Sequence, residues 1–99
     1  MNKMLKWLMN WFHSNCGDGW ESDHGVDIKT LENPGWCVVI DLACTSVSSS
    51  NFTEIRIDNG DNDWLFCCKR DDQFYGAGDT SKLEVILVIF KEWVDSQQT

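Results

Sequence analysis

The stretch "WCVVIDLAC", residues 36–44, is apolar at nearly every position. A run of this length that is rich in β-branched residues is typical of a strand, and successive side chains of a strand point to opposite sides of the sheet. Alternate positions therefore define two sets: Trp36, Val38, Ile40 and Leu42, and then Val39 with Ala43. Because both sets are apolar, we expect a central strand that is covered on both sides.

Segments with strand character lie on either side of this run. "GVDIKT" (25–30) precedes it, and "FTEIRID" (52–58) and "WLFCCK" (64–69) follow it, with a shorter segment "QFYG" at 73–76. Most of these segments alternate apolar with polar residues, as half-buried strands do, and polar loops separate them. The pattern predicts a meander of four or five antiparallel strands.

The turn "NPGW" (33–36) leads into the central run. Pro34 presets φ for the first central position of a type II turn, and Gly35 supplies the positive φ that the second position requires. Type II turns suit tight two-residue hairpins poorly, so we expect a wider loop or a bulge here.

Apolar residues recur with a helical period at both ends of the chain. Residues 2–14 predict an amphipathic N-terminal helix, and the residues from Asp79 onward predict a C-terminal helix. Asp79 is a candidate N-cap of that second helix, and Ser81 with Glu84 offers a capping box two residues later. A chain of 99 residues with these elements predicts one α+β domain, 1–99, in which both helices pack on the sheet.

The chain is strongly acidic, with a net charge of -8. An acidic surface without a basic run binds nucleic acid poorly, whereas it suits a basic protein partner. The five cysteines follow no disulfide pattern, and no apolar run could span a bilayer, so we expect reduced thiols, a cytoplasmic location and no membrane contact. The oligomeric state, a monomer or a weak dimer, is left open.

Three sets of residues are candidates for a metal site, a calcium loop or a catalytic thiol. The residue pattern of each set argues against that site. Cys67 and Cys68 are adjacent in a strand and point to opposite faces, so they cannot easily share a metal ion, and we expect no metal or other cofactor. The "DNGDND" loop (58–63) lacks the glycine and glutamate of a calcium loop. Cys16 is surrounded by carboxylates, which raise rather than lower the pKa of a thiol. We therefore expect no catalytic residue.

Trp20 is the one tryptophan that lies in the acidic segment 16–24. It could be a packed residue or an exposed interface residue, because tryptophan is enriched among residues that dominate binding. Both alternatives stay open at this point.

An ordered set of residues through most of the chain resembles the immunity protein 53 family of bacterial polymorphic toxin systems. The set comprises Cys16, Trp20-Glu21, Gly25-Val26, Ile28, Thr30-Leu31, Asn33-Pro34-Gly35-Trp36, Ile40-Asp41-Leu42, Trp64, Phe74, Gly76, Gly78-Asp79, Leu83, Ile86-Leu87, Phe90 and Trp93. The resemblance implies a non-enzymatic inhibitor that binds a cognate toxin.

If that toxin is a basic nuclease, acidic residues around an aromatic anchor could fill its phosphate-binding cleft. The predicted partner-binding residues are Asp18, Trp20, Glu21, Asp23, Asp58, Asp61, Asp63, Asp71 and Asp72. Two alternatives remain: a sulfurtransferase-like enzyme that uses Cys16 or the Cys67-Cys68 pair, and an acidic protein-binding regulatory module.

Overall fold

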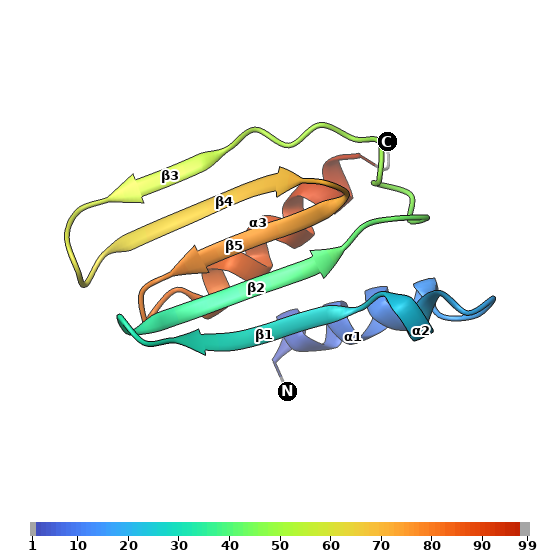
Figure 1. The fold of residues 1–99 in the computed structure, drawn as a ribbon, viewed down its shortest axis with the longest axis horizontal. Helices are drawn as coiled ribbons and strands as arrows, with labels where there is room; N and C mark the ends of the chain where they lie inside the picture. The colour runs from blue at the N-terminus through green and yellow to red at the C-terminus, as the bar shows by residue number, and fades with distance from the viewer. Residues whose placement is uncertain (1, 98–99) are drawn as a thin grey trace.

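A computed structural model of the protein describes residues 2–97 (Figure 1). Its elements are α1 (Lys3–Asn15), α2 (Trp20–Asp23), β1 (Val26–Leu31), β2 (Gly35–Asp41), β3 (Ile55–Asp58), β4 (Trp64–Arg70), β5 (Gln73–Gly78) and α3 (Leu83–Ser96). The α+β fold, with an N-terminal and a C-terminal helix packed on an antiparallel sheet of five strands, is confirmed. The short helix α2 was not predicted and lies in the segment expected to be an acidic loop.

The strands are arranged in the order β1-β2-β5-β4-β3, and every neighbouring pair is antiparallel. The sheet thus consists of a β1–β2 hairpin and a β3–β4–β5 meander, which join where β2 pairs with β5. Residues 42–54 carry the chain from β2 to the far edge of the sheet, where β3 lies (Figure 1).

The crossing segment 42–54 is anchored by contacts that its polar sequence did not predict. Val47 is fully buried, and Phe52 packs edge-on against Phe74. The ammonium group of Lys69, on β4, donates to the carbonyl oxygens of Ser48 and Ser50 at 2.6 and 2.7 Å. These contacts fix the path of the segment and so place β3 beside β4.

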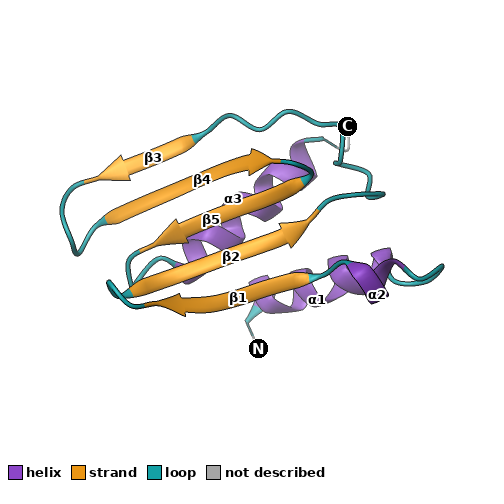
Figure 2. Ribbon diagram, viewed as in Figure 1, coloured by secondary structure: helices purple, strands orange, loops and turns teal. Residues whose placement is uncertain are grey.

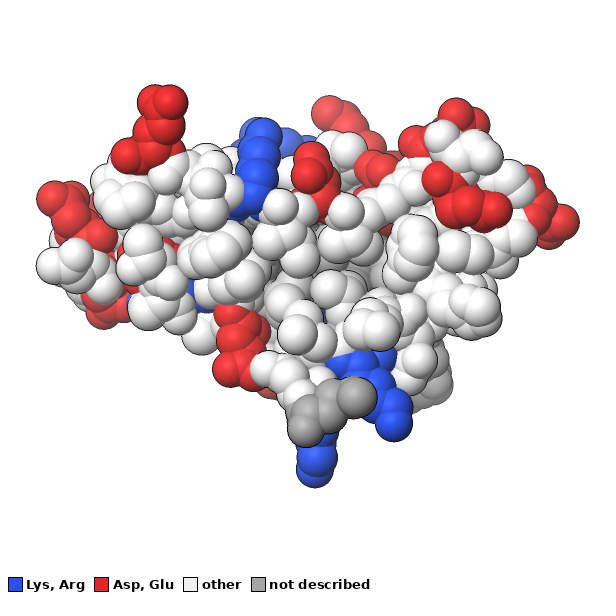
Figure 3. Space-filling view, turned by 90° about the horizontal axis from the view of Figure 1, so that it is seen from below, with Lys and Arg blue, Asp and Glu red and all other residues white. Residues whose placement is uncertain are grey.

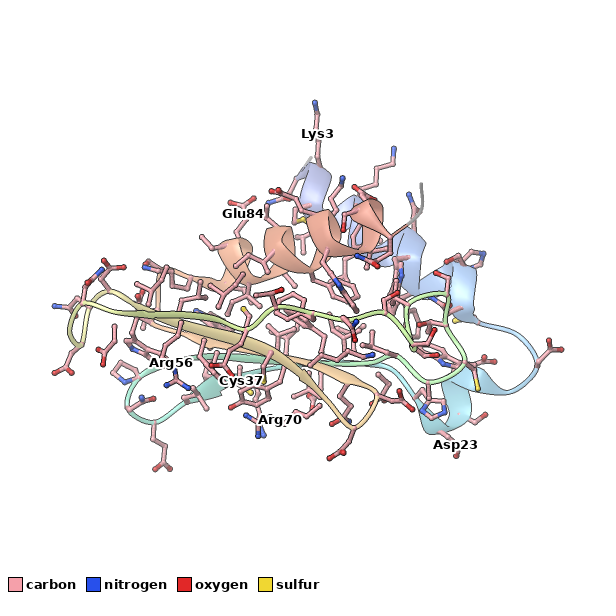
Figure 4. The ribbon with its side chains drawn as sticks, turned by 90° about the horizontal axis from the view of Figure 1, so that it is seen from above. Lys3, Asp23, Cys37, Arg56, Arg70 and Glu84 are labelled. Carbon is pink, nitrogen blue, oxygen red and sulfur yellow. The ribbon has the colours of Figure 1, made fainter. Side chains whose placement is uncertain are left out.

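Both long helices lie on the same side of the sheet (Figure 2). Figure 4 shows the same layering from above, with α1 and α3 on one side of the sheet and the short helix α2 beyond one end of the strands. Phe90 of α3 forms the centre of the core, because its ring contacts Trp7 and Trp11 of α1 and Phe74 of β5 at centroid distances of 5.0 to 5.8 Å. Burial of such rings is the main stabilising contribution to a domain of this size.

The expectation that the strand at 36–44 is covered on both sides was wrong. Val38 and Ile40 face α1 and α3 and are fully buried, whereas Cys37, which is also buried, and the partly exposed Val39 point to the opposite side of the sheet. The β2 strand is an inner strand, but β5 is the central one. The β2 strand is apolar on both sides, but α1 and α3 cover only one of them.

Gly35 does not adopt the positive φ predicted for a type II turn, since the glycines with positive φ are Gly17, Gly19 and Gly60. Leu31 pairs with Gly35, so the β1–β2 hairpin has a three-residue loop, as the expected wider loop required. A Cβ atom at Gly35 would overlap the carbonyl oxygen of Gly78. Glycine is therefore required at this position for close backbone approach rather than for φ.

Asp79 does not cap the C-terminal helix, because α3 begins at Leu83 and its N-cap is Lys82. The Asp79 carboxylate instead accepts hydrogen bonds from the Trp64 and Ser81 N–H groups and pairs with the Lys82 ammonium at 2.9 Å. The predicted Ser81–Glu84 capping box is also absent, since Glu84 accepts from Asn2. Asp79 thus connects β4 to the start of α3, which is a tertiary role that a capping pattern does not predict.

Candidate functional site

The predicted acidic contact residues lie in two groups at opposite ends of the strands. Asp18, Glu21, Asp23, Asp71 and Asp72 are at the end where α2 and the β4–β5 turn meet, and Asp58, Asp61 and Asp63 are at the β3–β4 loop. The molecule is 43 Å long, and Figure 3 shows acidic side chains gathered at both of its ends. All eight carboxylates are exposed. They form two acidic ends rather than one surface.

Some of the acidic residues at the α2 end have local structural roles. The Glu21 carboxylate accepts from the Gly17 N–H at 2.9 Å, and this hydrogen bond lowers the pKa of Glu21. Arg70 pairs with Gln73, so Asp71 and Asp72 form a two-residue hairpin loop with φ of 51° and 62°. Positive φ at both positions is typical of a type I′ turn, which aspartate tolerates.

At the other end, Asp63 is partly neutralised. Its carboxylate accepts from the Lys82 ammonium at 2.8 Å and from the Asn59 side chain at 3.1 Å, and these hydrogen bonds lower its pKa. Asp58 and Asp61 line a shallow depression of about 350 Å³ together with Arg56, Trp64 and Phe66. Those two carboxylates are therefore the ones at this end that a partner could reach without breaking an ion pair.

Trp20 is a packed residue. Its side chain is only 8% exposed, its ring packs against Trp11 and Phe12, and its indole N–H donates to the Ala43 carbonyl at 2.7 Å. Of the two alternatives left open by the sequence, the structure supports the packed one. Trp20 holds α2 against the core and offers no exposed ring to a partner.

The side of the sheet opposite to the helices carries a group of apolar residues that we call the open face. Directly opposed residues share a face, and the register pairs Cys37 with Ala77, Ala77 with Phe66, Val39 with Tyr75, and Tyr75 with Cys68. The open face is therefore made of three inner strands and consists of Cys37, Val39, Phe66, Cys68, Tyr75 and Ala77.

Arginines lie over the aromatic rings of the open face. The Arg56 guanidinium is 4.6 Å from the Phe66 ring centroid, and that of Arg70 is 4.9 Å from the Tyr75 centroid. Figure 4 labels Arg56, Arg70 and Cys37 on this side of the sheet. Sequence reasoning missed this group, although the apolar residues on the second face of residues 36–44 were a signal for it.

The candidate thiols Cys16, Cys67 and Cys68 lie in three different surroundings. Cys67 lies on the helix side and Cys68 on the open face, and burial raises the pKa of Cys67 to about 12, so that its thiol stays protonated. The Cys16 thiol donates to the Phe12 carbonyl at 3.3 Å. A nucleophilic cysteine needs a stabilised thiolate, and the burial of Cys67 opposes this.

Residues 2–97 offer neither a metal-binding cluster nor a membrane-spanning helix. No group of three or more His, Cys, Asp or Glu side chains in this range is placed to hold a metal ion. Within the same residues, no helix is long and apolar enough to cross a membrane.

Comparison with known proteins gives one match. No curated protein and no solved structure matches the chain. The family model described as Immunity protein 53 matches residues 5–95, which is nearly the whole chain. Immunity proteins neutralise toxins by binding a cognate partner and are generally not catalysts, and the resemblance of the ordered residues to this family is thereby confirmed. The chain belongs to the immunity protein 53 family.

Proposed function

We propose that the protein neutralises a basic toxin, such as a nuclease, by direct binding and without catalysis. The net charge of -8, with eight of the sixteen acidic residues at two exposed ends, is the observation that carries the proposal. Complementary charge speeds the encounter of two proteins and suppresses wrong partners. A basic nuclease carries positive charge for phosphate, and the same charge attracts this inhibitor.

The acidic residues that we assign to this encounter are those without a competing local partner. Asp18 and Asp23 fulfil this condition at the α2 end, and Asp58 and Asp61 fulfil it at the β3–β4 loop, where Asp63 is paired with Lys82. Asp71 and Asp72 add charge from the hairpin turn. The two ends would lie over two basic regions of the toxin, about one sheet length apart.

Co-expression with the toxin encoded beside the protein tests the proposal. We expect cells that produce both proteins to survive and the two proteins to co-purify in a fixed ratio. Survival without a complex would favour enzymatic protection instead. A Cys16→Ser variant adds a control, because an inhibitor keeps its protective effect whereas an enzyme that depends on this thiol loses it.

A charge-matched pair of variants tests the role of the acidic ends. The double variant Asp58→Lys and Asp61→Lys should slow association about 10-fold at low salt and weaken its salt dependence. The control, Glu84→Lys with Glu92→Lys, makes the same change in net charge on exposed residues of α3. Equal effects of the two double variants would mean that net charge alone, and not its position, matters.

A further inference from the structure

We infer that the open face is the docking surface for the toxin and that it takes an apolar patch of the toxin with a carboxylate placed to reach Arg70. The inference rests on the proposed function and adds the place and chemistry of the contact. The open face is distinct from the two acidic ends. The acidic ends would attract the toxin, whereas the open face would hold it.

The first argument is that the fold leaves this apolar face without a cover. An antiparallel sheet with one solvated face normally alternates apolar residues inside with polar residues outside. Here the outward positions in the middle of the three inner strands are apolar, and Val39, Phe66 and Tyr75 remain partly exposed, whereas the polar residues Asp41, Arg70 and Gln73 lie on the same side at the strand ends. Cys37, Cys68 and Ala77 are themselves buried, so the accessible apolar group consists of Val39, Phe66 and Tyr75, and an accessible apolar group of this kind is a candidate interaction site.

The second argument is the arrangement of polar and apolar residues. The outer strands contribute Asp27 and Lys29 on β1 and Arg56 and Asp58 on β3 to the same side of the sheet, and all four are exposed. An apolar centre with a charged rim is the usual composition of a protein interface. Tyrosine, phenylalanine and arginine are also among the residues enriched there, and Tyr75, Phe66 and Arg70 are grouped together.

Three carboxylates, Asp27, Asp41 and Asp58, lie on this side of the sheet, and the basic residues beside them indicate what the open face binds. Lys29, Arg56 and Arg70 are three of the eight basic residues of the chain. Among the described residues, Arg56 pairs only with the exposed Glu54, at 3.6 Å, and neither Lys29 nor Arg70 forms an ion pair. Arg70 lies over the Tyr75 ring and donates from Nε to the Cys68 sulfur at 3.3 Å, so its position is already fixed. A fixed guanidinium is suited to a carboxylate, which it can bind with two hydrogen bonds.

The acidic ends and the open face together define the complementary partner. Along the molecule, Arg56, Arg70 and the aromatic rings of the open face lie between the two acidic ends, together with Asp27 of β1. The toxin surface would therefore carry basic residues on either side of an apolar patch that contains an acidic residue. A surface that is basic throughout would fit the ends but would leave Arg70 without a carboxylate.

The first test measures affinity for a catalytically inactive variant of the toxin encoded beside the protein. Phe66→Glu should weaken binding about 30-fold or more, since a central aromatic contact contributes at least about that much. Arg70→Glu should weaken it about 10-fold or more. The control is Met9→Glu, which places the same charge at a 68% exposed residue on the helix side and should change affinity less than about twofold.

The second test does not need a variant to fold. Hydroxyl-radical footprinting of the unmodified complex should reduce oxidation of Phe66 and Tyr75, with Met9 as the exposed internal reference. Unchanged oxidation of both rings in a complex that does form would overturn the inference while leaving the proposed function intact. No complex and no protection by the unmodified protein would overturn the proposed function itself.

A second copy of the chain is the competing occupant. If the protein alone formed a dimer that Phe66→Glu dissociates, and if the toxin bound the Phe66→Glu monomer with unchanged affinity, the face would be a self-association surface and the inference would be wrong. A monomeric protein whose affinity for the toxin falls with Phe66→Glu would support it.

Discussion

The two faces of the sheet differ in what covers them, although their sequences are similarly apolar. On the covered face, Val38, Ile40 and Phe74 are fully buried beneath α1 and α3. On the open face, Val39, Phe66 and Tyr75 are partly exposed. Because stability depends on apolar area removed from water, the first face should determine folding. The second face is free to contribute to binding.

The neighbouring residues Phe74 and Tyr75 give the largest expected contrast. Phe74→Ala should reduce the free energy of unfolding by about 3 to 5 kcal/mol, because it leaves a cavity against Phe90 and Phe52. Tyr75→Ala removes a half-buried ring and should cost about 1 kcal/mol. Urea unfolding of both variants measures the difference, and similar losses would mean that both faces stabilise the fold equally.

Gly76, on the covered face, and Ala77, on the open face, should differ in how much a one-carbon change in side-chain size costs in stability. A Cβ at Gly76 would lie 2.5 Å from the Ile86 Cγ2 of α3, so Gly76→Ala should cost about 1 to 3 kcal/mol by pushing the helix away. Ala77→Gly, on the open face, should cost only about 0.5 to 1 kcal/mol through backbone entropy. Thermal unfolding monitored by circular dichroism compares the two, and a neutral Gly76→Ala would show that α3 is not tightly packed on β5.

Asp79 connects β4 to the start of α3 and should give a pH-dependent effect. Hydrogen bonds from the Ser81 hydroxyl and the Lys82 ammonium hold its pKa well below the ordinary value of 3.8. A lowered pKa in the folded state contributes stability that is present above pH 3.8 and is lost as the pH falls below it.

An Asp79→Asn variant should therefore be less stable than the unmodified protein at pH 7 and should lose less stability between pH 4 and pH 2. Chemical unfolding over this pH range measures both curves. Parallel curves would mean that another carboxylate accounts for the acid sensitivity. Asp95→Asn is a suitable control, because Asp95 forms an exposed pair with Lys91.

The β4–β5 turn should give the smallest effect, and in the opposite direction. Asp72 has a φ of 62°, which glycine adopts without the steric cost of a side chain. Asp72→Gly should therefore raise the free energy of unfolding by about 1 kcal/mol. Urea unfolding measures the stability of this variant, and its association rate with the toxin is a second readout. Loss of the Asp72 charge should lower the association rate, whereas relaxation of the turn should not.

Much of the fold could be predicted from local patterns, but the position of the acidic and aromatic residues could not. The helix from residues 2–14 and the five strand segments follow from the period of their apolar residues. The separation of Asp18 from Asp58 by the length of the sheet depends on strand direction, and the burial of Trp20 depends on contacts with α1. Neither can be deduced from spacing along the chain.

The sequence by itself determined the types of the main elements, the acidic charge and the family, because these depend on local period, on composition and on an ordered set of residues. Only the tertiary structure decided the strand order, in which the long connection 42–54 places β5 in the centre. It also decided that both helices cover the same face. The residues at 36–44 specify two apolar faces, but long-range packing determines which of them is covered, and here it leaves Cys37 and Val39 on the face that we assign to the toxin.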